Sequence, residues 1–343
     1  MIDWITGKFT CTHNPNALLT GRSIRTKIID GVERLEYEVT HRKSVKGSHD
    51  ANITIRSYTD RTIEISGNPV KFLQGHNVFG TNDLRALVVA LFERLCSIPE
   101  LQLTPTVDEL NLIKTGAYRL SRVDVNEHFA FPSEHVAKAW LRAAGRSANM
   151  MFRGAGLFNE GTLYFTPQSR RFVPKIYHKG SEISSTNKDH RLPDELLQIP
   201  ELLQYAQNSL RFEIKILSTQ LNDWHLHLGC NWDQDTATML IREQFIDKLQ
   251  LSANMSLNPE VLDTLPNSLK PVYALWESGQ DLRQCYSKAQ FYKRRSQLLE
   301  FGVDIAIIQD KEQQLSNVVP MIRYLEAVPM GIPEWAYEKG LVA

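Results

Sequence analysis

The amino-acid sequence predicts an α+β protein, with helices packed on one face of an antiparallel sheet and a smaller, mostly helical C-terminal domain after it. In the first two thirds of the chain, short segments alternate apolar and polar residues, as half-buried strands do. From about residue 230, apolar residues recur at helical spacing instead. The length of 343 residues, at about 150 residues per domain, fits two domains, which we place at 1–230 and 231–343.

The first predicted elements are a hairpin and two helices. Asn52–Ser57 and Arg61–Ser66 alternate apolar and polar residues on either side of a short turn. Leucine and valine recur at helical spacing through Leu84–Leu95, which predicts an amphipathic helix over a sheet. Thr106 and Glu109 have the spacing of a capping box and predict a second, short helix.

Three further strands carry unusual polar faces. They are predicted at Ser121–Asn126, Phe172–Lys179 and Arg211–Lys215, with a helix at Ser133–Ala144 and a hairpin strand at Thr162–Thr166 between them. Because side chains alternate along a strand, each places its apolar residues on one face and its polar residues on the other. The polar faces carry Arg122, Asp124 and Asn126; Lys175, Tyr177 and Lys179; and Arg211, Glu213 and Lys215.

The C-terminal domain is predicted from three helical segments, Asp235–Leu249, Pro259–Leu265 and Ser287–Glu300. The last begins with Ser287 and Gln290 at capping-box spacing. It also carries a cluster of positive charge, formed by Lys293, Arg294 and Arg295.

Overall composition excludes several classes of protein. Lysine plus arginine equals aspartate plus glutamate at 39 each, so bulk charge does not draw this chain to polyanions. The longest apolar run, Ala86–Phe92, is far shorter than the roughly 20 residues of a membrane span, and Met1–Trp4 does not begin a signal peptide. The four cysteines lie far apart, which suits free thiols in a reducing cytoplasm.

A local anion site is predicted on the Tyr177 strand. The segment Ser169–Lys179 contains Arg170, Arg171, Lys175 and Lys179 and no acidic residue. Tyr177 in this setting can attack a phosphodiester while Lys179 stabilises the charge that develops. The alternative is an ordinary surface tyrosine on a basic strand.

Three carboxylates, Asp124, Glu182 and Glu213, lie close to this basic strip in the predicted arrangement. Hard oxygen ligands suit Mg²⁺ or Mn²⁺, and such an ion can polarise a phosphate for in-line attack. The alternative is ion pairing, in which Arg122 neutralises Asp124 and Arg211 neutralises Glu213.

Histidines offer a competing metal site. His225 and His227 flank Leu226, and on a strand both rings would point to one face. We expect His76, in the glycine-punctuated loop, to brace that loop by a hydrogen bond. His178 points away from Tyr177 and is not expected to be its base.

With these residues in place, the sequence resembles the gene II replication initiator proteins of filamentous bacteriophages. It is similar, more weakly, to staphylococcal-type rolling-circle plasmid initiators. The string Leu73–Gly80 is the most specific part of the likeness, which covers residues 60–325. The matching segments, in order, are Val70–Leu84, Ser121–Asp124, Tyr177–Lys179 with Glu182, Leu210–Glu213 and Asn317–Arg323.

The resemblance implies an endonuclease that starts rolling-circle replication. Such an enzyme nicks one strand of the double-stranded replicative form at the phage origin, becomes joined to the 5′ phosphate and later recloses the displaced single strand. Tyr177 falls on the position of the attacking tyrosine, and Asp124, Glu182 and Glu213 fall on acidic motif positions. A His-x-His triplet is not part of the family pattern, which favours the carboxylates over His225 and His227 as ligands.

The same resemblance implies a relaxase-like (HUH-type) sheet in the nicking and joining domain at 1–230, followed by a helical DNA-binding domain. We expect Arg170, Arg171 and Lys175 to contact DNA in the first domain, and Lys293, Arg294 and Arg295 to contact phosphates in the second. A host helicase and polymerase are the implied partners, in the bacterial cytoplasm. The alternative function is a non-catalytic regulator that binds the origin or single-stranded DNA.

Overall fold

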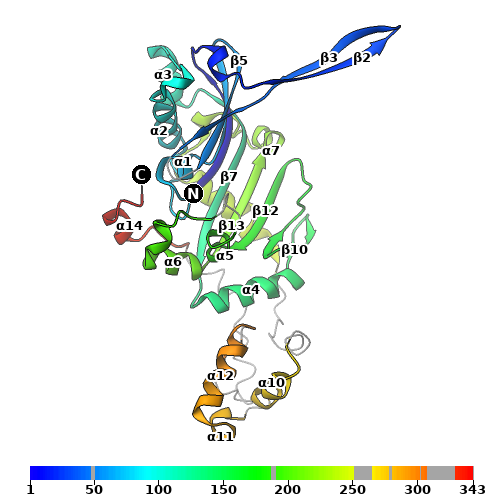
Figure 1. The fold of residues 1–343 in the computed structure, drawn as a ribbon, viewed down its shortest axis with the longest axis vertical. Helices are drawn as coiled ribbons and strands as arrows, with labels where there is room; N and C mark the ends of the chain where they lie inside the picture. Colours follow the sequence, from blue (N-terminus) through cyan, green and yellow to red (C-terminus); the bar gives the residue numbers. More distant parts are fainter. Residues whose placement is uncertain are drawn as a thin grey trace.

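The computed structural model describes residues 1–47, 51–186, 191–250, 265–277, 280–301, 303–306 and 329–342 (Figure 1). Within these ranges the main sheet has nine strands, in the order β10-β11-β12-β13-β7-β1-β6-β5-β4. Every neighbouring pair is antiparallel, as predicted. The strands are β1 (Ile2–Thr10), β4 (Lys43–Lys46), β5 (Asn52–Thr59), β6 (Thr62–Gly67), β7 (Arg119–Ala130), β10 (Leu157–Asn159), β11 (Thr162–Tyr164), β12 (Phe172–His178) and β13 (Ser209–Leu217).

Two smaller sheets accompany the main one. β8 (Asn149–Met150), β9 (Gly154–Ala155) and β14 (Leu249–Gln250) form a short three-stranded sheet. β2 (Arg22–Ile29) and β3 (Val32–Thr40) form a separate hairpin, which extends away from the main sheet as the long blue ribbon in Figure 1.

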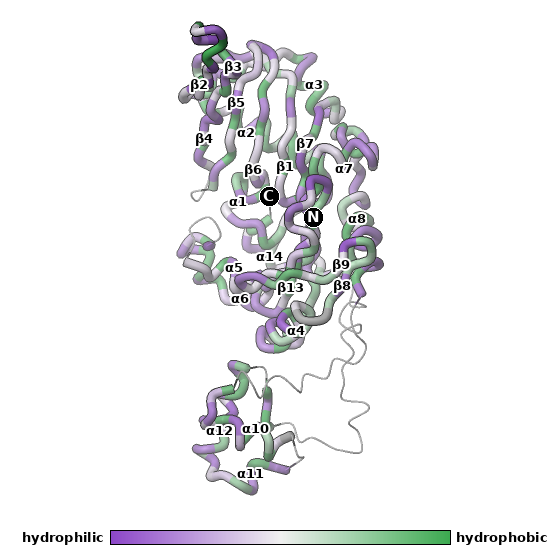
Figure 2. The backbone as a smooth tube through the Cα atoms, turned by 90° about the vertical axis from the view of Figure 1, so that its right-hand side faces the viewer, coloured by the Kyte–Doolittle hydropathy of each residue, from purple (hydrophilic) through white to green (hydrophobic). Residues whose placement is uncertain are grey.

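Helices cover the apolar face of the main sheet. Apolar and polar residues alternate along the strands (Figure 2). The apolar stripes of α2 (Leu84–Cys96), α4 (Glu134–Ser147) and α8 (Thr236–Gln244) share one core with the inward side chains of the strands. The other helices of this part are α1 (Pro69–Gln74), α3 (Val107–Thr115), α5 (Lys179–Ile183), α6 (Pro200–Gln207) and α7 (Ser218–Asp223).

The local sequence signals explain these elements. The predicted hairpin is confirmed, because β5 and β6 pair in antiparallel register. Helix α2 buries Leu84, Leu87, Val88, Leu91 and Leu95, as its spacing predicts. Both hydrogen bonds of the capping box between Thr106 and Glu109 are formed at the start of α3.

The helices of the C-terminal part pack in three separate hydrophobic cores. α10 (Lys270–Glu277), α11 (Leu282–Cys285) and α12 (Lys288–Leu299) share a small hydrophobic core of their own. In contrast, α8 packs on the main sheet, and α14 (Glu334–Glu338) packs with Val78, Phe79 and Ile183 of the larger part. The boundary at 230/231 therefore stays a prediction.

Some of the sequence predictions concern residues outside the described ranges. Most of the helix predicted at 259–265 and all of the segment 317–323 lie outside the described residues. The capping box of α12 at Ser287 and Gln290 is present. Among the helices that the structure describes, none is both long and apolar enough to cross a membrane.

Candidate active site

The three strands with unusual polar faces are neighbours in the sheet, in the order β12-β13-β7. Tyr177 lies opposite Arg211, which in turn lies opposite His128. Directly opposite residues of antiparallel strands point to the same face, so one row of polar side chains crosses three strands. A second row, formed by Lys175, Glu213 and Asn126, lies beside it.

This polar face is buried, whereas the polar face of a half-buried strand ordinarily points to water. The exposed fraction is 0% for Arg211, 2% for Glu213 and 3% for Asp124. The loop around Asn77 covers part of the face, since the Arg211 guanidinium donates to the Asn77 carbonyl. Polar groups held away from water need partners in the protein, and they interact strongly with one another.

Tyr177 is held by a carboxylate that also forms an ion pair. Its hydroxyl donates to Oε2 of Glu213 at 2.8 Å, while Nζ of Lys175 lies 2.9 Å from Oε1 of the same carboxylate. The Lys175 ammonium is also 5.1 Å from the centre of the Tyr177 ring. Glu213 is therefore placed to accept the phenol proton, and Lys175 to balance its charge.

Burial raises the pKa of Tyr177 well above its ordinary value, and the carboxylates of Glu182 and Glu213 raise it further. The buried guanidinium of Arg211 acts in the opposite direction. The phenol is therefore protonated in this state, and attack on phosphorus requires a base, or added positive charge, close to its oxygen.

Lys179 is not on the strand face where the alternation placed it. The strand ends at His178, and Lys179 is the first residue of α5. Its Nζ donates to Oδ1 of Asn77 at 2.9 Å and to the Glu182 carboxylate. Burial, helped by the charge of Arg211, lowers the pKa of Lys179 to about 8.

His178, which was not expected to be the base for Tyr177, has a structural role. Nδ1 accepts from the backbone N–H of Ser181 and caps α5, and Nε2 lies 2.7 Å from the carbonyl oxygen of Gln207. Both ring nitrogens are thus engaged away from Tyr177. The loop-bracing role of His76 is also seen, since its Nδ1 accepts from the backbone of Val78 at 3.3 Å.

Arg211 anchors a network that the sequence did not reveal. Its Nε donates to Nε2 of His128 at 3.0 Å, and a terminal nitrogen lies 3.4 Å from Oδ1 of Asp3. Burial and the Arg211 charge hold the pKa of His128 well below its ordinary value, so the ring is neutral and accepts this bond. Asn68 and Asn77 donate to the same Asp3 oxygen at 2.9 and 2.8 Å.

The three predicted metal ligands are each paired with a cation. Arg122 binds both oxygens of Asp124, Lys175 binds Glu213, and Lys179 binds Glu182. The alternative ion pair is thus seen for Asp124, whereas Glu213 pairs with Lys175 and not with Arg211. Among the described residues, no three His, Cys, Asp or Glu side chains converge as metal ligands.

Asn126 nevertheless suits a hard cation beside these carboxylates. It lies directly opposite Glu213 and two residues from Asp124, and it is fully buried. Among the described residues, neither polar atom of its side-chain amide has a hydrogen-bond partner. Burial raises the pKa of Asp124 to about 6. An oxygen ligand set of Asp124, Asn126 and Glu213 fits Mg²⁺ or Mn²⁺ and would satisfy the amide oxygen.

Comparison with known proteins decides the family. Residues 1–235 match the N-terminal family of the replication-associated gene II protein, and residues 258–342 match the C-terminal family of the same protein. The chain is 34% identical over 339 residues to the replication-associated gene II protein of Enterobacteria phage I2-2, covering 97% of this chain and 95% of that protein. The chain belongs to the replication-associated gene II protein family of filamentous phages.

More distant relatives match a smaller part. The replication-associated gene II protein of Enterobacteria phage M13 is 28% identical over 181 residues, which are 49% of this chain and 42% of the phage M13 protein. The phage fd protein of the same name matches to the same extent. No solved structure matches the chain.

The histidine triplet of this gene II family member is not on a strand. His225 and His227 lie in the segment after α7, where His225 has a left-handed backbone with φ of 58°. The His227 carbonyl accepts from the backbone of Leu120, near the start of β7. Tyr177 lies opposite Arg211, which lies opposite His128 on β7, eight residues beyond Leu120. The structure thus separates the triplet from Tyr177.

The predicted DNA-binding residues differ in their exposure and in their contacts with other side chains. Arg170 is exposed, whereas Arg171 is paired with Asp223 and bonded to Gln220. On α12, Lys293 is exposed, the Arg294 guanidinium lies 4.5 Å from the ring centre of Tyr286, and Arg295 binds both oxygens of Asp304 at 2.7 Å. Their contacts with DNA stay predictions.

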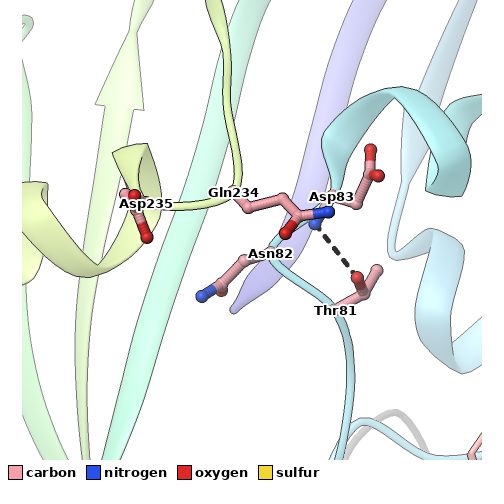
Figure 3. Close-up of a pocket in the computed structure, with 5 residues that line it drawn as sticks. All are labelled: Thr81, Asn82, Asp83, Gln234 and Asp235. Carbon is pink, nitrogen blue, oxygen red and sulfur yellow. Dashed lines mark hydrogen bonds between the residues drawn. The ribbon is translucent and has the colours of Figure 1, made fainter.

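A pocket of about 600 Å³ reaches Tyr177. Its lining includes Lys138, Tyr164, Lys175 and Glu182. A second hollow, of about 380 Å³, is lined by Thr81–Asp83 and Gln234–Asp235 (Figure 3). It contains none of the predicted site residues, and Asp83 there caps α2. Of these two pockets, the first is the one that Tyr177 lines.

Proposed function

We propose that this protein starts rolling-circle replication by nicking one strand of the phage replicative form at its origin. The observation that carries this proposal concerns Tyr177, whose hydroxyl is bonded to Glu213 and which lines a pocket together with Lys175. Family membership supplies the biological setting of phage DNA replication. The antiparallel sheet supports, as part of the same proposal, a relaxase-like (HUH-type) fold.

In the proposed reaction, the Tyr177 oxygen attacks the scissile phosphorus and its proton passes to Glu213. The bond from phosphorus to the 3′ oxygen breaks, the 3′ oxygen takes up a proton, and the 5′ phosphate stays on the tyrosine. A phenol, with a pKa near 10, is a better leaving group than an alcohol, so a 3′ hydroxyl can reverse the step without ATP. Later attack by the displaced strand's 3′ hydroxyl would reclose it.

A divalent metal belongs to this proposal. Asp124, Asn126 and Glu213 would hold Mg²⁺ or Mn²⁺, with Glu182 at the pocket wall as a further carboxylate. The ion would supply positive charge that polarises the phosphate and lowers the cost of deprotonating the phenol. Arg122 and Lys175 pair with Asp124 and Glu213 and hold these carboxylates in place when it is absent.

Tyr177→Phe tests the proposal. We expect wild-type protein with Mg²⁺ or Mn²⁺ to nick supercoiled DNA carrying its own phage origin and to become linked to the 5′ end. Loss of the nucleophile should lower nicking by about 10³-fold or more and abolish the linkage, as a denaturing gel would show. Tyr164→Phe removes a hydroxyl from the same pocket and should keep the linkage. Folded wild type that binds this DNA but never nicks it would indicate the non-catalytic regulator.

Lys179→Ala separates chemistry from docking. Because the Lys179 charge is buried near the site, we expect nicking to slow by about 10²-fold with little change in origin binding. Single-turnover cleavage and filter binding on the same DNA measure the two effects. Lys339→Ala, which breaks a surface ion pair with Glu201, is the control. Equal losses in both assays would make Lys179 a docking residue.

A further inference from the structure

The hairpin formed by β2 and β3, called the arm below, has no role in the site described above. It extends from the main sheet in Figure 1, and nearly all of its residues are exposed. Asp30 and Gly31 join the strands, with φ of 52° and 75°. Positive φ at both central residues gives a tight turn whose twist matches that of the strands, so the arm is a regular two-stranded ribbon.

The two faces of the arm differ in charge. Register places Arg25 opposite Tyr37 and Lys27 opposite Arg34, with Glu36 as the extra residue of a bulge. One face therefore carries three cations, of which Arg25 is paired with the bulge residue Glu36 while Lys27 and Arg34 are not paired with an acid among the described residues, and we call it the basic face. It consists of Ser23, Arg25, Lys27, Ile29, Val32, Arg34, Tyr37 and Val39. The opposite face carries one cation and two acids, as Arg22, Glu33 and Glu38.

Two charges on the basic face repel each other. Lys27 and Arg34 are directly opposite, and like charges in that position destabilise a strand pair. Within the described part of the chain, neither has an acidic ion-pair partner, whereas Arg25 lies 2.9 Å from Glu36 and Arg22 lies 2.9 Å from Glu38. A two-stranded ribbon is only marginally stable by itself, so this repulsion is costly unless an anion neutralises it.

Exposed apolar side chains accompany these charges. On the basic face Val32 is 57% exposed, Tyr37 47%, and Ile29 and Val39 41% each. A long ribbon with unpaired cations and apolar side chains on one face fits a ligand that is a long polyanion with apolar edges. Duplex DNA is such a ligand, and its major groove admits a two-stranded ribbon.

We propose that the basic face of the arm lies in the major groove of duplex DNA next to the nicking site. Lys27 and Arg34 contact phosphates on the groove walls, and the apolar side chains between them contact base edges and thymine methyl groups. The inference rests on the proposed function for its DNA substrate. It adds a second contact, which holds the duplex while Tyr177 acts on one strand.

The test compares duplex and single-stranded origin DNA. We expect Lys27→Gln/Arg34→Gln to weaken binding to a duplex origin fragment by about tenfold and to reduce the salt slope of log affinity by about 2. These changes remove repulsion within the arm, so they should not unfold it. Lys114→Gln/Lys339→Gln removes two positive charges outside the arm and should keep the wild-type salt slope.

Single-stranded cleavage separates failure of the arm from failure of the nicking proposal. The arm variant should cleave a single-stranded origin oligonucleotide at the wild-type rate, because no duplex is present. Wild type that cannot nick supercoiled origin DNA would count against the proposed function, whatever the arm does. Unchanged duplex affinity and salt slope in the arm variant would overturn the arm proposal. So would a change in oligomeric state by sedimentation without loss of DNA binding, which would assign the arm to a second copy.

Discussion

Glu213→Gln is expected to lower metal-dependent nicking by about 10³-fold or more, although the substitution changes only one charge and almost no volume. Glu213 accepts the Tyr177 hydroxyl through one oxygen and holds Lys175 through the other. Glutamine can keep a hydrogen bond to the phenol. It cannot take the phenol proton, and it is a poor ligand for a divalent cation.

Single-turnover cleavage across a Mn²⁺ titration measures this effect. If Glu213 binds the ion, the residual rate of the variant should require more Mn²⁺ than wild type does. Glu201→Gln, at an exposed carboxylate that pairs with Lys339, is the matched control and should cleave normally. A wild-type rate and wild-type Mn²⁺ dependence in Glu213→Gln would remove Glu213 from both roles.

A thermal melt separates chemistry from folding in the same variant. The Lys175 side chain is 28% exposed, and Glu213 is the carboxylate that pairs with it. The neutral amide leaves the ammonium without that charge, but water can still reach it, so we expect a small loss of stability. A cleaved fraction that falls while the melting temperature holds would assign Glu213 to the reaction itself.

Residue patterns in the sequence predicted those helices and strands that depend only on a short stretch of the chain. The β5–β6 hairpin, α2 and α3 depend on alternation, helical spacing and a capping box, all contained in short stretches of sequence. The polar faces of β7, β12 and β13 followed from the same alternation, and the antiparallel register brought them together.

One residue shows where local pattern is insufficient. Alternation along β12 extends to Lys179, yet the His178 side chain accepts a backbone N–H and begins a helix one residue earlier. A side-chain cap competes with the strand for the same backbone, and histidine is not among the residues that signal such a cap most strongly. The lysine thus reaches Asn77 from a helix and not from the strand face.

Long-range burial could not be predicted from single strands. Arg211 and Asp3 are separated by 208 residues. The sequence around either residue does not indicate that the two side chains will meet in a buried contact. The buried amide of Asn126 became informative only when its lack of partners was seen. In contrast, the arm can be predicted from the sequence, since Asp30-Gly31 between alternating segments is a strong hairpin turn. The difference in charge between its two faces was seen only from the strand register.

Arg211→Met is expected to lower the free energy of unfolding by about 3 kcal/mol, because it removes one partner of a buried charged network. Arg211 is 0% exposed and bonds His128, Asp3 and the Asn77 carbonyl. Asp3 would keep its two amide donors from Asn68 and Asn77, which limits the loss. Urea unfolding of wild type and variant measures the difference.

The converse substitution should cost at least as much. Asp3→Asn leaves the Arg211 guanidinium buried without its nearest carboxylate, and a buried unpaired charge is more costly than a carboxylate that keeps neutral donors. The double variant Asp3→Asn/Arg211→Met should therefore lose less than the sum of the two single losses. Additive losses would show that the 3.4 Å contact between them contributes little, and that His128 and Asn77 hold the guanidinium instead.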